Sequence, residues 1–178
     1  MMGRITLVTG GARSGKSSYA LKLAQALSPP RYFIATCPRI DPELEGRIRR
    51  HREERRHQGW HTVEEERDLA KVVQKITSGV VVVDCLTLWV NNLFFAAPDI
   101  SEETISRHTA DLLERCSHKD VTYLFVTNEV GWSIVPENSQ ARRYRDLVGR
   151  CNQVMADAAH RVVLVACGQP LTIKNVEP

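Results

Sequence analysis

Residues 10–17 have the types and spacing of a phosphate-binding loop. They read Gly10, Gly11, Ala12, Arg13, Ser14, Gly15, Lys16 and Ser17, and so fit the pattern G-x-x-x-x-G-K-[ST]. Backbone N–H groups of such a loop and the following helix N-terminus both attract phosphate oxygens. We expect Lys16 to reach the β- and γ-phosphates of a nucleoside triphosphate, and the Ser17 hydroxyl to hold Mg²⁺.

The segments on either side of this loop are those that a P-loop requires. An apolar stretch over 5–9 predicts a strand, and apolar residues spaced three and four apart over 18–27 predict a helix. A glycine turn that matches the pattern by chance is the alternative. Because strand, loop and helix occur in the right order, the sequence favours nucleotide binding.

A second signal of nucleotide binding comes later in the chain, at Asp84. A P-loop protein needs a carboxylate at the end of a neighbouring strand to hold Mg²⁺, directly or through water. Asp84 follows the four valines of 80–83, which predict a buried strand. The alternative is that Asp84 caps the helix after it, whose N-terminus also favours a negative charge. The two roles are compatible.

An arginine-rich segment carries a histidine that could act as a nucleophile. Six arginines lie between Arg47 and Arg56, on a helix predicted over 41–58. Within this helix His51 falls on the apolar stripe, one turn from Arg47 and from Arg55. Neighbouring guanidinium groups disfavour a further positive charge on the imidazole, and a neutral imidazole beside fixed cations suits attack on a phosphoryl group. The alternatives are a solvated helix face and a structural histidine.

Composition indicates one ordinary globular domain over residues 1–178. The chain is 43% hydrophobic and 25% charged, and its net charge of +3 is too small to imply a nucleic-acid partner. Five cysteines without a C-x-x-C pair suggest reduced thiols in a cytoplasmic protein. The first strand begins too early for a signal peptide, and no apolar run is long enough to cross a bilayer, so we expect no membrane insertion.

Strand-like and helix-like stretches alternate along the chain. This alternation predicts an α/β fold with a mostly parallel sheet and helices on both faces, and the turn at 168–170 predicts a closing antiparallel hairpin. The predicted strands are 5–9, 31–36, 60–63, 80–84, 121–126 and 162–166, followed by 171–173 in the hairpin. The predicted helices are 18–27, 41–58, 65–76, 101–116 and 139–159.

Together these motifs resemble the bifunctional adenosylcobinamide kinase / adenosylcobinamide-phosphate guanylyltransferase family of cobalamin assembly. The resemblance covers essentially the whole chain, and T-N-E-V-G at 127–131 and I-V-P-E-N at 134–138 make it far more specific than a P-loop alone. It further rests on residues 9–17, 34–36, 47–48, 51–52, 60–64, 84–89, 145–146, 149–150 and 152–153.

The resemblance implies a fold and a two-step reaction. The fold is a RecA-like P-loop NTPase fold, in a homotrimer with active sites near subunit contacts. In the first step the γ-phosphoryl of ATP or GTP goes to the hydroxyl of the corrinoid adenosylcobinamide. In the second, GTP guanylylates an enzyme histidine, and the GMP then moves to the substrate phosphate to give adenosylcobinamide-GDP.

The resemblance also assigns roles to particular residues. The nucleophilic histidine of the family falls on His51. Nucleotide contacts fall on the P-loop and on Ala35, Thr36, Cys37, Arg52, Glu53, Glu54, Arg55, Glu64 and Asp84. The expected Mg²⁺ ligands, Ser17 and Asp84, come from the P-loop pattern and the strand-end carboxylate described above.

Two other functions are compatible with parts of the sequence. A monofunctional P-loop kinase of small molecules would leave His51 structural. A nucleotide switch or nucleic-acid-binding module would use the arginine-rich helix to hold phosphate backbones, with salt-dependent binding. No stacking aromatics are interleaved with those arginines, which argues against single-strand recognition, and we expect no nucleic-acid partner.

Overall fold

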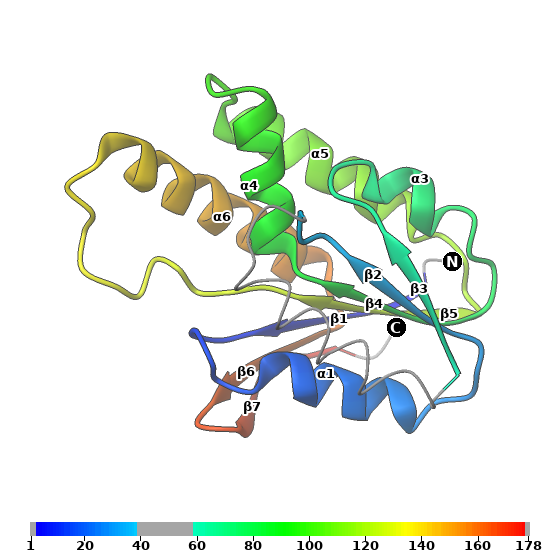
Figure 1. The fold of residues 1–178 in the computed structure, drawn as a ribbon. Helices are drawn as coiled ribbons and strands as arrows, with labels where there is room; N and C mark the ends of the chain where they lie inside the picture. Colours follow the sequence, from blue (N-terminus) through cyan, green and yellow to red (C-terminus); the bar gives the residue numbers. More distant parts are fainter. Residues whose placement is uncertain (1–2, 39–58, 177–178) are drawn as a thin grey trace.

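The computed structural model describes residues 3–38 and 59–176. Their strands form one seven-stranded sheet (Figure 1). The strand order is β3-β2-β4-β5-β1-β6-β7. Every neighbouring pair is parallel except β6–β7, which confirms the predicted sheet and its closing hairpin. The strands are β1 (Arg4–Thr9), β2 (Arg31–Ala35), β3 (Trp60–Glu64), β4 (Gly79–Asp84), β5 (Val121–Val126), β6 (Arg161–Ala166) and β7 (Gln169–Asn175).

Helices cover both faces of the sheet, as the alternating pattern predicts. They are α1 (Lys16–Gln25), α3 (Leu69–Val73), α4 (Leu86–Ala96), α5 (Glu102–Arg115) and α6 (Ser139–Ala158). Helix α1 lies on one face, and the others lie on the opposite face (Figure 1). Strand side chains alternate between faces, so Leu7 joins the core beneath α3–α6 and Val8 joins the core beneath α1. None of the described helices has the length and apolar character of a membrane span.

Two helices differ from the sequence expectation. The predicted helix over 65–76 is only α3, because the Glu65 carboxylate accepts the backbone N–H groups of Arg67 and Asp68 and holds these residues in a turn. No bounds were predicted for α4, which is apolar on most of its surface and so lacks a clear amphipathic period. The helix predicted over 41–58 lies outside the described residues.

The expectation that Asp84 ends a strand next to the P-loop strand is wrong. β5 lies between β1 and β4, so β1 has β5 and β6 as its neighbours. Strand order depends on the path of each crossover connection, which the spacing of residues along the chain does not encode. All three strands are parallel, however, so their carboxyl ends meet at the same edge, where parallel α/β sheets bind ligands.

Candidate nucleotide-binding site

The P-loop is shaped by its glycines and held by the neighbouring strands. Gly15 has φ = +94°, a left-handed conformation that favours glycine, and caps the start of α1. A Cβ atom on Gly10 would lie 2.3 Å from the carbonyl oxygen of Val165, so the close approach of β6 also requires glycine. The backbone N–H of Gly168 donates to the carbonyl of Ser14 at 2.8 Å, which ties the loop to the β6–β7 turn.

Lys16 and Ser17 open helix α1 at the point where phosphate binding needs them. The Lys16 ammonium donates to the carbonyl of Gly11 at 3.0 Å, so the side chain lies back over the loop. The first turn of α1 has no acidic residue to oppose its positive end. Backbone N–H groups, an ammonium and a hydroxyl therefore meet at one helix N-terminus, as the sequence predicts for a triphosphate site.

Three further predicted residues lie side by side at the carboxyl ends of adjacent strands. Ala35 on β2 pairs in register with Glu64 on β3 and with Asp84 on β4. Asp84 in turn pairs with Val126 on β5, which pairs with Val8 on the P-loop strand. Ala35 and Asp84 are half-buried, whereas Glu64 is exposed. The structure thus aligns these three residues with the P-loop along one sheet edge.

Thr36 is fully buried and joins the ends of β2 and β4. Its hydroxyl donates to the carbonyl of Cys85 and accepts the Cys85 N–H, each at 2.8 Å. The Asn92 amide of α4 donates to the Thr36 carbonyl, also at 2.8 Å. The two bonds to Cys85 hold the chain next to Asp84, so the Thr36 side chain acts here as a support for the site. Cys37, which follows, is half-buried.

The Cys85 thiol is not a nucleophile at neutral pH. Burial, and secondly the negative charge of Asp84, raise its pKa to about 12. Because the thiolate is the reactive form of cysteine, this thiol is inert beside the site.

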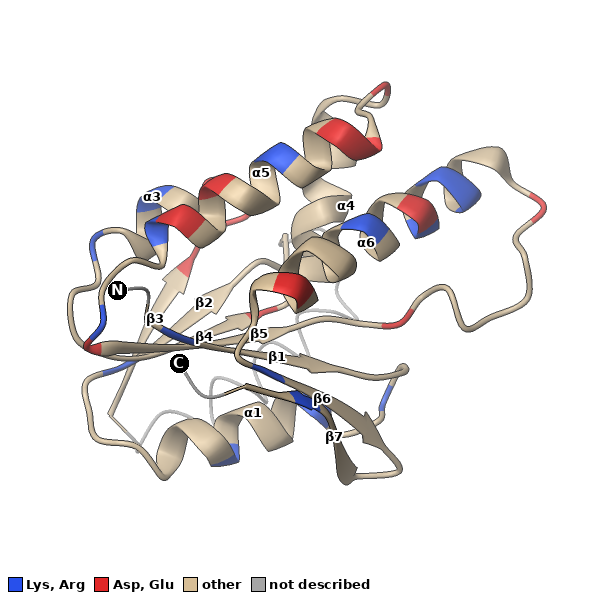
Figure 2. Cartoon of the chain, turned by 180° about the vertical axis from the view of Figure 1, so that it is seen from behind, with Lys and Arg blue, Asp and Glu red and all other residues tan. Residues whose placement is uncertain are grey.

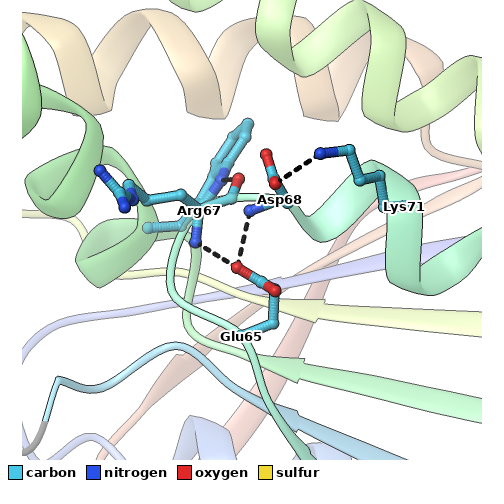
Figure 3. A network of polar contacts seen from close by, with 5 residues as sticks. Glu65, Arg67, Asp68 and Lys71 are labelled. Atoms are coloured by element: carbon cyan, nitrogen blue, oxygen red, sulfur yellow. Dashed lines mark hydrogen bonds and ion pairs between the residues drawn. The ribbon is translucent and has the colours of Figure 1, made fainter.

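The loop that follows Glu64 is ordered by its own polar contacts (Figure 3). Beyond the turn that Glu65 caps, the Asp68 carboxylate accepts from the Lys71 ammonium at 2.8 Å. The indole N–H of Trp89, from α4, donates to the carbonyl of Arg67 at 2.8 Å. These contacts anchor the chain just after Glu64 to both α3 and α4.

Glu129 lies in the site, although no role of its own was predicted for this residue of the T-N-E-V-G segment. It follows β5, the strand beside β1, and its backbone N–H donates to the carbonyl of Gly10 at 3.1 Å. Its carboxylate oxygen Oε1 accepts from the Thr9 hydroxyl and, at 3.3 Å, from the Asn152 amide of α6. The available signal was an acidic residue shortly after a buried strand, the same signal that singled out Asp84.

A buried polar network holds Asn152, the residue whose amide donates to the Glu129 carboxylate. The Thr127 hydroxyl donates to Oδ1 of Asn152 at 2.7 Å and lies 3.2 Å from the Thr87 hydroxyl. The Thr87 hydroxyl accepts the backbone N–H of Asn128 at 2.8 Å. A connected network of this kind fixes side-chain orientation, because breaking one bond leaves a buried polar group without a partner.

The predicted histidine and its arginines are not among the described residues. His51, Arg52, Glu53, Glu54 and Arg55 fall in 39–58, and their placement stays a prediction.

Comparison with known proteins decides the family. Residues 6–173 match the model of the CobU family, described as cobinamide kinase / cobinamide phosphate guanyltransferase. The chain belongs to this family. It is 39% identical to the bifunctional adenosylcobalamin biosynthesis protein CobU of Escherichia coli (strain K12), over 94% of this chain and 98% of that one. It is 35% identical to the bifunctional adenosylcobalamin biosynthesis protein CobP of Pseudomonas aeruginosa, over 95% and 96%.

A solved structure of low sequence identity shares the fold. The flagellar accessory protein FlaH from Methanocaldococcus jannaschii superposes with a TM-score of 0.56 at 14% identity, covering 98% of this chain and 80% of FlaH. This likeness concerns the fold alone.

Proposed function

We propose that this member of the CobU family carries out both reactions of its family. It phosphorylates adenosylcobinamide with ATP or GTP, and then transfers GMP from GTP through a GMP–histidine intermediate to give adenosylcobinamide-GDP and pyrophosphate. The observation that carries the proposal is the family match over residues 6–173, which spans the P-loop and every strand end of the site.

In the phosphorylation step the P-loop and Lys16 hold the β- and γ-phosphates. Ser17 and Asp84 are the proposed Mg²⁺ ligands; both offer oxygen atoms, the donors that this ion prefers. Mg²⁺ would neutralise charge on the phosphate oxygens. The nucleotide-binding residues of the chain then position the γ-phosphoryl for attack by the corrinoid hydroxyl.

In the guanylylation step a ring nitrogen of His51 attacks the α-phosphorus of GTP. The bond between the α-phosphorus and the bridging oxygen breaks, and pyrophosphate leaves. The corrinoid phosphate then attacks the same phosphorus, the P–N bond breaks and the histidine is regenerated. Arg52 and Arg55 would neutralise the triphosphate, with Glu53 and Glu54 in the same proposed contact segment.

Glu64 is the proposed reader of the guanine base. A carboxylate can accept from both N1–H and the exocyclic amine of guanine, a pair of donors that adenine lacks. Four strand spacings, roughly 19 Å in total, separate β1 from β3 along the sheet edge. GTP bound by both the P-loop and Glu64 would therefore lie across that edge, over Ala35 and Asp84.

The proposed assembly is a homotrimer in the cytoplasm with the corrinoid as its partner molecule. A nucleic-acid partner is not proposed. Basic and acidic residues are interspersed along α5 and α6 (Figure 2). Binding to the phosphate backbone of a nucleic acid needs a continuous basic surface instead.

Incubation with [α-³²P]GTP and Mg²⁺, followed by denaturing electrophoresis, tests the proposal against a monofunctional kinase. We expect label on the protein that is labile to acid and stable to alkali, as a phosphoramidate is. A parallel assay follows the phosphorylation of adenosylcobinamide by [γ-³²P]ATP. A protein that phosphorylates the corrinoid but takes no label from [α-³²P]GTP would be a kinase only.

A further inference from the structure

The carboxylate of Glu129 stands beside the P-loop, and neither the phosphate-binding set nor the proposed Mg²⁺ ligands include it. We propose that Glu129 accepts the proton of the corrinoid hydroxyl during phosphoryl transfer. This inference rests on the proposed kinase activity and adds the group that activates its acceptor.

Glu129 is anchored to Gly10, the first residue of the P-loop. Its N–H bonds to the carbonyl of Gly10, and the Lys16 ammonium bonds to the carbonyl of the next residue, Gly11. The main chain of Glu129 and the ammonium proposed to meet the β- and γ-phosphates are therefore bonded to consecutive residues of one loop. The carboxylate follows β5, at the same edge of the sheet.

The two oxygens of this carboxylate have different surroundings. Oε1 accepts from the Thr9 hydroxyl and from the Asn152 amide, which together set the orientation of the group. Within residues 3–38 and 59–176, no donor contacts Oε2, and the side chain is only half-buried. One oxygen thus holds the group in place while the other remains able to receive a proton.

The direction of phosphoryl transfer brings the acceptor to this carboxylate. The attacking and leaving oxygens lie roughly in line with the γ-phosphorus, so the acceptor approaches from the side opposite the β-phosphate. In the proposed binding mode the P-loop and the N-terminus of α1 surround the β-phosphate, so the acceptor approaches from the sheet edge. Glu129 lies on that edge, beside the first glycine of the loop.

The chemical step balances without any other reactant. The hydroxyl oxygen forms a bond to the γ-phosphorus, the bond from that phosphorus to the β,γ-bridging oxygen breaks, and the hydroxyl proton moves to Oε2 of Glu129. The proton later passes to water. Guanylyl transfer needs no such base, because its nucleophiles are an unprotonated histidine nitrogen and then a phosphate oxygen.

This difference between the two half-reactions supplies the test. We expect Glu129→Gln to lower the kcat of corrinoid phosphorylation about 10²–10⁴-fold, the usual contribution of a positioned proton acceptor. Labelling of the same protein by [α-³²P]GTP should stay within threefold of wild type, which also shows that the variant is folded and binds nucleotide. Glu129→Asp, which keeps a carboxylate, should recover at least tenfold over Glu129→Gln. Glu114→Gln, an exposed acid on α5, is the control and should leave both reactions unchanged.

Two outcomes would overturn the inference. Phosphorylation by Glu129→Gln within threefold of wild type would show that no proton transfer to this residue is needed. Loss of both labelling and phosphorylation would instead place Glu129 in the shared nucleotide site. A wild-type protein without kinase activity would refute the proposed function itself, which is a distinct result.

Discussion

Thr36 and Cys85 are joined by two reciprocal hydrogen bonds of 2.8 Å between the Thr36 hydroxyl and the Cys85 backbone. The pair links the carboxyl end of β2 to that of β4, one residue beyond the registered pair of Ala35 and Asp84. The buried hydroxyl therefore adds two hydrogen bonds to the backbone pairing that aligns the ends of β2 and β4 at the proposed nucleotide site.

Replacing Thr36 with valine should destabilise the protein. Valine has nearly the same shape but leaves the buried N–H of Cys85 without its acceptor, at a cost of about 1–3 kcal/mol in the free energy of unfolding. Urea denaturation measures this cost, with Thr62→Val at an exposed site on β3 as the control. A Thr36→Val protein as stable as wild type would show that the reciprocal bonds contribute nothing.

Lys16 should be needed in both half-reactions. Each develops charge on phosphate oxygens that the proposed site places against the ammonium, so we expect Lys16→Ala to lose about 10²-fold or more in both rates. Lys22→Ala removes an exposed ammonium from the same helix and should change neither rate. Rates for Lys16→Ala within twofold of wild type in both assays would refute the P-loop assignment.

Glu64 should set the choice of base in guanylyl transfer. Loss of a bidentate contact to a base costs roughly 1–3 kcal/mol of the free-energy difference between the right and the wrong base. Glu64→Ala should therefore reduce the preference for GTP over ATP by about that amount. Competition between the two nucleotides in the labelling assay measures the preference. Glu66→Ala, an exposed acid in the following loop, should retain it. An unchanged preference in Glu64→Ala would mean that guanine is read by another residue.

Buried thiols should make the protein less stable in alkali. Burial raises the pKa of Cys116 and of Cys151 from 9.0 to about 12. Above pH 9 the unfolded chain releases these protons while the folded chain keeps them, so the free energy of unfolding falls as the pH rises from 9 to 12. The slope from each thiol approaches about 1.4 kcal/mol per pH unit.

Urea denaturation at a series of pH values from 8 to 11 measures this slope. Cys116→Ala removes one of the buried thiols and should make the slope shallower than that of wild type. The same slope in both proteins would mean that the folded state does not hold this proton.

Local patterns predicted most of what the structure contains. The P-loop, the valine-rich strand before Asp84 and the hairpin after β6 were predictable, because each depends on residues close together in the chain. The neighbour of the P-loop strand was not predictable, since strand order depends on long-range packing. For the same reason the pairing of Thr9 with Glu129, residues 120 positions apart, has no signature in the sequence.

The most direct test of the two-step account is transfer of label from [α-³²P]GTP to a His51→Asn protein. We predict that this variant takes no label and makes no adenosylcobinamide-GDP, yet still phosphorylates adenosylcobinamide with [γ-³²P]ATP. His57→Asn, from the same segment, should behave like wild type. Label that persists on His51→Asn would contradict the account and move the nucleophile to another residue, with His57 the first to test.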